Sequence, residues 1–342
     1  MEREMVRRLT DACRAGQPER VAELIAAGAD VNTRLGSGPR RDPKPLLWTV
    51  RPATWTAGHR GVLELLLDAG ADPRGGGPEG GLSPLVAAAE QGHREAVELL
   101  LSRGAPVGFY EAAALGDVGR VEAGLAEQPA LATAVRPCGV GIHGGPGTAL
   151  HFAALSKLGR RESVVARRLV AVVDLLVARG APVGAFAVDG VTAPPPLARA
   201  ARADNAAVAA ALLRLGADPA DALVDALAND AESVLELLAP TDLAVDLPGD
   251  PKLGNSLLDE MIRWGRLASA RWLIGRGAPV GRSDRRGWNA LHYACSRGVA
   301  PDLVESLLAR GAPPDARDAE GRTPLDVARA NGRAKLVEVL SG

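Results

Sequence analysis

The chain has 342 residues, and this length indicates several domains or an elongated array, because a single packed core stops growing at roughly 250–300 residues. Apolar residues make up 47% of the chain and aromatic residues only 3%, so alanine and leucine must fill the core. The net charge of −1 excludes a global field that would attract nucleic acid or an anionic membrane. We therefore expect neither of these as a partner.

The three cysteines, Cys13, Cys138 and Cys295, lie far apart. An odd and sparse set argues against a disulfide framework and fits a reducing compartment. The N-terminal segment has no apolar signal core, and no apolar run reaches the roughly 18 residues that span a bilayer. We expect a cytoplasmic protein. The richness in arginine, alanine and glycine also hints at a bacterial source with a GC-rich genome.

A Gly-Ala marker recurs along the chain, usually followed by Asp-Val, Asp-Pro or Pro-Val. It begins at Gly28, Gly70, Gly104, Gly180, Gly216, Gly277 and Gly311. Three of the intervals are 34, 36 and 34 residues long. Self-similarity at a fixed period of this length predicts a repeat architecture.

The segment 81–107, with the sequence GLSPLVAAAEQGHREAVELLLSRGAPV, is the most regular copy. Ser83 can cap the first helix and Pro84 suits its first turn. The small Ala88 and Ala89 allow neighbouring helices to approach closely, and Gly92 permits the reversal into a second helix. The glycine of the marker then ends that helix in a left-handed conformation.

These features resemble the ankyrin repeat, with its Gly, Thr-Pro-Leu-His, paired alanines, Gly-His, Leu-Leu and Gly-Ala-Asp pattern. The resemblance covers almost the whole chain and implies an all-α solenoid of about ten helix-turn-helix repeats in one array. We place the repeats at 9–32, 45–73, 82–107, 109–131, 147–183, 189–219, 222–239, 254–280, 287–313 and 321–340. Because one unit cannot bury both of its helices alone, neighbouring units must stack.

Several copies depart from the pattern. The fourth leaves no room for an incoming hairpin, and the seventh is short and degenerate. The fifth contains an insertion at 155–169 with a basic bias, and it follows a glycine-rich loop at 138–147. These irregular copies are more informative about function than the regular ones.

One position of the first helix, two residues after the leucine of Pro-Leu or its equivalent, varies strongly along the array. In ankyrin-like arrays this part of the helix borders a concave groove where partners bind, so the resemblance implies a groove with aromatic ends and a charged middle. The alternative is a half-exposed position that tolerates any residue. Together with Trp55 from an insertion, the candidate partner-binding residues are Trp48, Glu111, Phe152, Arg199, Asp225, Asp259 and Tyr293.

The remaining tryptophans and histidines have structural interpretations. Trp264, Trp272 and Trp288 are interpreted as packing residues at element ends. By the resemblance, His151 and His292 occupy the structural Thr-Pro-Leu-His position, where the ring hydrogen-bonds within and between repeats.

No catalytic or metal-binding constellation emerges. The segment 139–144 matches the dinucleotide fingerprint GxGxxG, but the residues before it, Val135, Arg136 and Pro137, do not read as a buried strand and no βαβ unit surrounds it, so we expect an inter-repeat finger. Cys138, His143 and His151 are too few for a zinc site. Cys295 takes a small core position beside His292. We therefore expect no metal and no cofactor.

The sequence thus predicts a monomeric, non-catalytic scaffold that binds a protein or peptide in its groove. One alternative is an enzyme that uses Glu111, Asp225 and Asp259 as acid and base groups beside Arg199. Another is a regulatory or neutralising partner of a neighbouring gene product.

Overall fold

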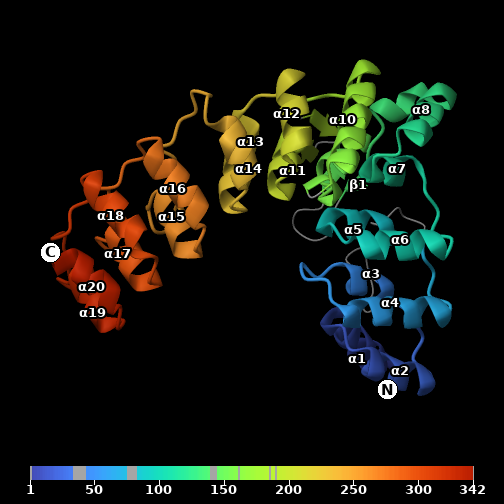
Figure 1. Cartoon of the computed structure of the whole chain (residues 1–342), viewed down its shortest axis with the longest axis horizontal. Coiled ribbons are helices and arrows are strands. Elements are labelled where there is room, and N and C mark those ends of the chain that lie inside the picture. Colours follow the sequence, from blue (N-terminus) through green and yellow to red (C-terminus); the bar gives the residue numbers. More distant parts are fainter. Residues whose placement is uncertain are drawn as a thin grey trace. The chain divides into compact units, whose positions relative to one another are not determined.

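A computed structural model describes residues 2–33, 44–74, 83–138, 145–160, 162–184, 186–188 and 191–341. In these ranges the chain forms 20 α-helices, which follow one another as ten pairs. Figure 1 shows that each pair is a short helical hairpin and that, within α1–α12, each hairpin lies beside the next. The all-α solenoid expected from the sequence is confirmed. The helix pairs follow the order of the predicted repeats, but α1 (from Glu2) and α13 (from Ala220) begin before the predicted bounds at residues 9 and 222. The chain divides into two compact units, Met1–Asp221 and Ala222–Gly342.

The first unit contains six pairs, with the inner helix of each named first. They are α1 (Glu2–Ala15) and α2 (Pro18–Ala26), α3 (Pro45–Val50) and α4 (Ala57–Asp68), α5 (Pro84–Gln91) and α6 (Arg94–Ser102), α7 (Phe109–Leu115) and α8 (Val118–Glu127), α9 (Ala149–Ala154) and α10 (Ser163–Ala178), and α11 (Pro196–Ala203) and α12 (Ala206–Arg214). Two 3₁₀ turns, η1 (Pro129–Ala132) and η3 (Leu158–Arg160), follow α8 and α9.

The second unit contains four pairs, and its boundary falls in the first turn of α13. They are α13 (Ala220–Ala228) and α14 (Glu232–Leu238), α15 (Leu257–Trp264) and α16 (Leu267–Gly275), α17 (Ala290–Arg297) and α18 (Pro301–Ala309), and α19 (Pro324–Ala330) and α20 (Ala334–Ser341).

Two short β-hairpins are added to the helices of the first unit. β1 (Arg136–Cys138) pairs antiparallel with β2 (Gly145–Gly147), and β3 (Phe186–Val188) pairs antiparallel with β4 (Val191–Ala193). Each hairpin precedes an inner helix, α9 or α11. The fifth and sixth repeats therefore begin with extended fingers of the kind that the fourth repeat lacks.

The helix ends follow the chemistry of their residues. The Ser83 hydroxyl accepts a hydrogen bond from the Val86 N–H, and Thr323 and Asp326 form a reciprocal capping box at the start of α19. These contacts satisfy N–H groups that have no partner within the helix. The seven marker glycines all have positive φ, between 78° and 94°, as the sequence predicts for left-handed helix ends.

Small and branched apolar residues build the core. Ala88, Ala89 and Ala112 on inner helices are fully buried, as are leucines such as Leu66 and Leu100 on outer helices. Because alanine has little volume, adjacent inner helices can lie close together. The expectation that alanine and leucine fill the core is confirmed.

Imidazole rings connect neighbouring repeats. His151 accepts the Thr148 backbone N–H at Nδ1 (3.1 Å), and its Nε2 lies 2.8 Å from the Pro194 carbonyl oxygen of the next repeat. The His292 ring lies between Asn289 (2.7 Å) and the Arg322 carbonyl oxygen (3.2 Å) in the same way. The structural role predicted for both residues is confirmed.

The basic insertion at 155–169 fastens the fifth repeat to the third. The Lys157 backbone N–H donates to the Ala89 carbonyl oxygen at 2.9 Å, and Arg94 pairs with Glu162 at 2.8 Å. The insertion also supplies the first turns of α10, which is 16 residues long. Its described residues therefore have a structural role within the first unit.

A close approach between the first two repeats yields a stability prediction. A Cβ on Gly58 in α4 would overlap the Gly16 carbonyl oxygen, whereas a Cβ on Gly61 in the same helix would meet Pro18 at an ordinary 3.4 Å. We expect Gly58→Ala to lower the free energy of unfolding by about 1–3 kcal/mol, as overpacking does. Gly61→Ala is the matched control and should raise it by about 0.5–1 kcal/mol. Urea unfolding of both variants checks this, and equal effects would contradict it.

Burial of His151 makes stability depend on pH. Burial, opposed by the Pro194 hydrogen bond and assisted by the nearby Arg199 charge, lowers the pKa of His151 to about 4. Since the folded pKa lies below the ordinary 6.5, the unfolded chain is protonated first as the pH falls. The contribution to stability is thus complete above pH 6.5 and is lost toward pH 4.

Between pH 7 and pH 5 we expect this residue to account for a loss of about 2 kcal/mol in the free energy of unfolding. The measurement is urea unfolding of the wild type and of His151→Gln at both pH values. The variant should be less stable at pH 7 but should lose less on acidification. The prediction fails if the two proteins lose the same amount.

Candidate functional site

The residue that ends each inner helix in a left-handed turn gives a common reference for the repeats. In eight of the ten repeats this residue has positive φ. It is a glycine in six of the eight, and it is Asp204 (φ 50°) in the sixth repeat and Asp230 (φ 54°) in the seventh. We call the position five residues before the turn the inner row. Its members are Asp11, Ala87, Glu111, Arg199, Asp225, Glu260, Tyr293 and Val327, with Trp48 and Phe152 at the corresponding place in the second and fifth repeats.

This register corrects one residue of the sequence-based set. Glu260, not Asp259, lies five residues before the turn at Gly265. Asp259 instead forms a capping box, in which its carboxylate accepts hydrogen bonds from the Ser256 N–H (2.9 Å) and hydroxyl (2.7 Å). Burial raises the pKa of Asp259 to about 6 despite these hydrogen bonds. Its carboxylate therefore serves the start of α15.

Most of the inner row is buried, which fits neither the open groove predicted from the sequence nor its alternative, a half-exposed position. Glu111, Phe152, Arg199 and Tyr293 expose between 3% and 6% of their surface. Trp48 and Asp225 are half-buried. Because most of these side chains are buried, they cannot touch a partner directly. They can affect binding only by positioning the exposed residues around them.

Two of the predicted residues, Glu111 and Phe152, belong to one cluster in the first unit. The Phe152 ring lies 5.1 Å from that of Tyr110, and the Arg136 guanidinium lies 5.6 Å from the Tyr110 ring centre. Arg136 of β1 also pairs with Glu111 at 3.7 Å. The hairpin thus brings a cation to a carboxylate that would otherwise be buried without its counterion.

Trp48 and Trp55 lie in separate surroundings. Arg14 and Arg51 lie over the Trp48 ring, 5.5 Å and 4.8 Å from its centre. The Trp55 ring lies 5.9 Å from that of His59, and its indole N–H donates to Glu95 at 3.3 Å. Both tryptophans therefore have cationic or polar neighbours while remaining half-buried.

The carboxylates of the enzyme alternative have different surroundings. Glu111 is paired with Arg136 in the first unit, and Asp259 caps α15 in the second. Arg199 is buried close to His151 and belongs to the first unit, whereas the half-buried Asp225 belongs to the second.

A second row, two residues before the turn, was missed by the sequence reasoning. It lies three residues beyond the inner row, so both rows share one face of the helix. Arginine occupies it in the first, second, sixth and eighth repeats and keeps access to solvent, whereas Ala114 and Leu155 at the same position are buried. This exposed row includes Arg14, Glu90, Arg202, Arg263 and Ser296, with Arg51 as its counterpart in the second repeat. The spacing of three from each inner-row residue is the signal that could have found it.

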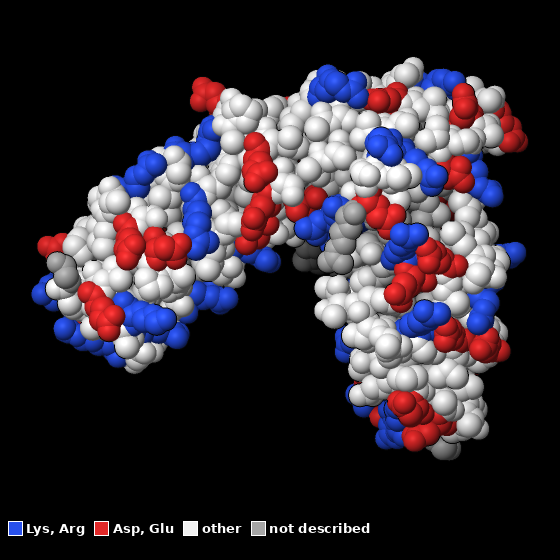
Figure 2. Space-filling model, viewed as in Figure 1, with Lys and Arg blue, Asp and Glu red and all other residues white. Residues whose placement is uncertain are grey.

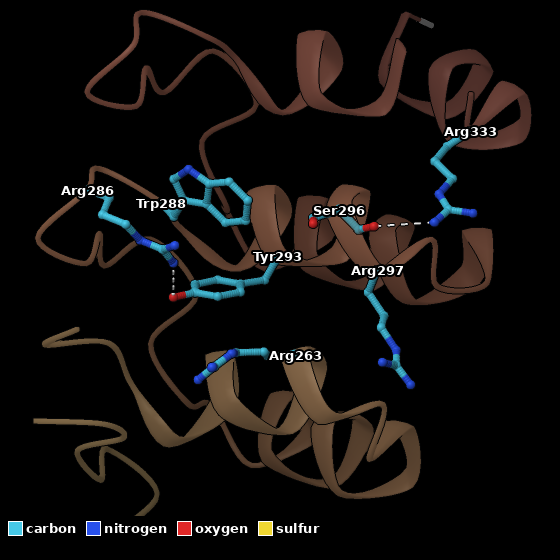
Figure 3. A pocket seen from close by; sticks show the side chains of 7 residues that line it. All are labelled: Arg263, Arg286, Trp288, Tyr293, Ser296, Arg297 and Arg333. Atoms are coloured by element: carbon cyan, nitrogen blue, oxygen red, sulfur yellow. Dashed lines mark hydrogen bonds between the residues drawn. The ribbon is translucent and has the colours of Figure 1, made fainter. Parts of the chain in front are cut away.

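In the second unit the two rows line a pocket of about 500 Å³, shown in Figure 3. Tyr293 and Ser296 of α17 form its floor, and Arg286 and Trp288 come from the segment that leads into α17. Three more arginines complete the lining from α15, α17 and the turn before α20: Arg263, Arg297 and Arg333.

A buried polar network holds the aromatic end of this pocket. The Tyr293 hydroxyl donates to Asp284 (2.8 Å) and accepts from Arg286 (2.9 Å). Asp284 also accepts the Trp288 N–H at 2.9 Å, and these hydrogen bonds hold the pKa of Asp284 below its ordinary value despite burial. The ring and guanidinium are thus fixed before any ligand arrives.

The other tryptophans divide between packing and exposure. The Trp272 indole donates to the Leu235 carbonyl oxygen at 2.9 Å, as a packing residue would. Trp288 donates to Asp318 at 3.1 Å and also lines the pocket. The packing role expected for Trp264 is wrong, because 49% of its surface is exposed.

The remaining motifs give no site in the described ranges. The GxGxxG segment, His143 and the side chain of Cys138 lie outside the residues that are described. Elsewhere, no group of three or more His, Cys, Asp or Glu side chains is placed to hold a metal ion. None of the described helices is long and apolar enough to cross a membrane. Figure 2 shows both charge signs interspersed on the visible face of each unit.

Two family models match the chain. One describes ankyrin repeats in three copies and matches residues 9–109, and the other describes ankyrin repeats in many copies and matches residues 265–328. The irregular fourth to seventh repeats lie between the two matches.

Known proteins resemble parts of the chain. The human protein phosphatase 1 regulatory subunit 27 is 35% identical over 89 residues, which are 26% of this chain and 56% of that protein. The E3 ubiquitin-protein ligase Ufd4 of Drosophila melanogaster is 35% identical over 108 residues, 31% of this chain and 4% of the ligase. The chain therefore matches about half of the first relative and a small part of the second.

Among solved structures, the ankyrin repeat domain of human ASB11 is 22% identical with a TM-score of 0.45, covering 75% of this chain and 98% of that one. The Bd0816 predatory endopeptidase from Bdellovibrio bacteriovorus in complex with immunity protein Bd3460 contains a chain that is 23% identical with a TM-score of 0.44, covering 57% and 97%.

The paired helices, the capped inner-helix starts, the left-handed glycine turns and the two family matches lead to one assignment. Ankyrin repeats are a scaffold that typically mediates protein–protein interaction. This chain belongs to the ankyrin repeat family.

Proposed function

We propose that the protein is a non-catalytic scaffold that binds a protein or peptide through the exposed face of its inner helices. The observation that carries the proposal is the exposed row, in which arginines of the first, second, sixth and eighth repeats lie beside the aromatic and charged inner row. Arg14 and Arg51 flank Trp48 in the first unit, and Arg263 lines the pocket with Tyr293 in the second. Arginine, tryptophan and tyrosine are the residues most enriched at interface hot spots.

Residue chemistry supports this face over the outer helices. The arginines of the outer helices, such as Arg20, Arg60 and Arg94, pair with a glutamate three or four residues along the same helix. Such exposed ion pairs keep a surface hydrophilic and contribute little to the free energy of unfolding. On the inner face, Arg14 and Arg263 also pair with an acid of their own helix, Asp11 and Glu260. The guanidinium groups of Arg14 and Arg51 in addition lie over the Trp48 ring, where contact with a partner could remove water from them.

The proposed partner is a protein or peptide, the proposed state is a monomer and the proposed location is the cytoplasm. Cys13 and Cys295 are free and buried, and burial raises the pKa of each thiol to about 12. Buried, protonated thiols of this kind act as small core residues and suit a reducing compartment. A regulator of a neighbouring gene product is one form that such a scaffold could take.

Charge reversal on the inner face should weaken binding of the partner. We expect a variant with Glu at positions 14, 51, 202 and 263 to bind its dominant captured partner at least about tenfold more weakly, because four contacts become repulsive. The control variant reverses four exposed arginines of the outer helices, Arg20, Arg60, Arg120 and Arg271, and carries the same net charge.

The partner is first identified by affinity capture with the wild type, and its dissociation constant is then measured with each purified variant. Thermal unfolding verifies that both variants fold. Equal weakening by the two variants would indicate a bulk charge effect, and unchanged binding by the inner-face variant would exclude this face as the main surface.

A further inference from the structure

We infer that the pocket along α17 binds an acidic segment of a partner protein, with aspartate or glutamate carboxylates held by Arg297 and Arg333. The inference rests on the proposed function and assigns the chemistry of one site within it. It is argued from the charge of the pocket, from the freedom of its arginine donors and from its aromatic end.

The pocket carries more positive charge than its own carboxylates neutralise. Two of its four arginines have buried partners, since Arg263 pairs with Glu260 at 3.0 Å and Arg286 pairs with Asp284 at 3.0 Å. For Arg297 and Arg333, no carboxylate of the described residues lies within ion-pairing distance (4.0 Å). An anion in the pocket would therefore meet two cations that have no counterion in the described part of the chain.

The positions of these two arginines are set by the turns beneath them. A Cβ on Gly265 would fall 2.5 Å from a terminal nitrogen of Arg297, and a Cβ on Gly298 would fall 2.6 Å from Nε of Arg333. Each guanidinium therefore lies directly against a turn glycine, where any larger residue would displace it. Both arginines are nonetheless exposed.

Packing on the turns leaves most of the donors available. Arg333 donates one hydrogen bond to the Ser296 carbonyl oxygen at 3.4 Å, seen as a dashed line in Figure 3. A guanidinium has five N–H donors in a planar fork that matches a carboxylate in two-point geometry. The remaining donors of Arg333, and those of Arg297 nearby, can thus bind carboxylates of a ligand.

The opposite end of the pocket suits the apolar part of a peptide rather than a small inorganic anion. The Arg286 guanidinium covers the Trp288 ring at 4.7 Å, and the rings of Trp288 and Tyr293 meet edge to face at 5.3 Å. Because Tyr293 is buried and hydrogen-bonded, it holds this end rigid, and the half-buried Trp288 ring supplies the aromatic surface. A ligand that fills the whole pocket of about 500 Å³ needs both an anionic group and an apolar one.

The test uses the full chain and a fluorescein-labelled peptide rich in Asp and Glu with one Phe. Matched peptides replace the acidic residues by Lys or carry a phosphoserine in place of each Glu, and inorganic phosphate serves as a competitor. Fluorescence anisotropy gives the dissociation constants. We expect the acidic peptide to bind, the Lys peptide not to bind, and binding to weaken as salt is raised.

We expect Arg297→Ala and Arg333→Ala each to weaken the acidic peptide by about fivefold or more, as removal of a central interface arginine does. The matched control is Arg310→Ala, because Arg310 is also exposed in the second unit and donates to a carbonyl oxygen of the preceding repeat, that of Gly275 at 3.2 Å. It lies at the end of an outer helix, so its loss should change the affinity by less than about twofold.

The inference is overturned if the wild type does not bind the acidic peptide, or if Arg310→Ala weakens it as much as the pocket variants do. Binding of the phosphopeptide alone, or displacement by inorganic phosphate, would overturn the assignment of carboxylates. If the acidic peptide does not bind while the inner-face charge reversal still abolishes partner capture, only the assignment of the pocket is rejected. If the peptide binds while that charge reversal leaves capture unchanged, the wider proposal falls and the pocket stands.

Discussion

Hydrogen bonds from side chains of one repeat to backbone carbonyls of its neighbour determine how each helix pair sits on the next. His93 binds the Pro52 carbonyl oxygen at 2.7 Å, Asn205 donates to that of Ser156 at 2.8 Å, and Ser269 donates to that of Leu227 at 2.8 Å. The carbonyls at the ends of short inner helices would otherwise be left without partners, and a buried carbonyl without a partner is costly. Because each repeat supplies hydrogen-bond donors for the carbonyl groups of its neighbour, stability within a unit depends on contacts between adjacent repeats.

This stacking decides which residues can meet a partner. The inner row faces the next repeat, so charges placed there need local counterions. Glu111 has Arg136, and Glu260 has Arg263 together with the Asn255 amide at 2.6 Å. A buried pair of this kind contributes little net stability, but loss of one member is strongly destabilising. Recognition is therefore better served by arginines of the exposed row that are not counterions of a buried carboxylate among the described residues, such as Arg51 over the Trp48 ring.

The sequence predicted the repeats, the glycine turns, the caps and the histidine links because each depends on residues close together in the chain. The site was harder to predict, since burial depends on the neighbouring repeat. Asp259 was selected because Leu257 and Leu258 both fit the leucine of the pattern, and the turn at Gly265 resolves the ambiguity in favour of Glu260. The hydrogen bond between Lys157 of the 155–169 insertion and Ala89 joins residues that are separated in the sequence by the whole fourth repeat. No pattern of neighbouring residues in the sequence indicates this contact.

The turns that identify the family also determine where cations gather. An inner helix ends with carbonyl groups and the negative end of its dipole, which favour a nearby cation, and its turn glycine has no side chain to keep that cation away. The His59 ring lies over Gly16, and the guanidinium groups of Arg297 and Arg333 lie over Gly265 and Gly298. At Gly16, Nε2 of the His59 ring is already engaged in a hydrogen bond with the Arg14 carbonyl oxygen. An arginine at the same place satisfies the turn and keeps donors to spare, so a change from imidazole to guanidinium converts a structural link into a binding site.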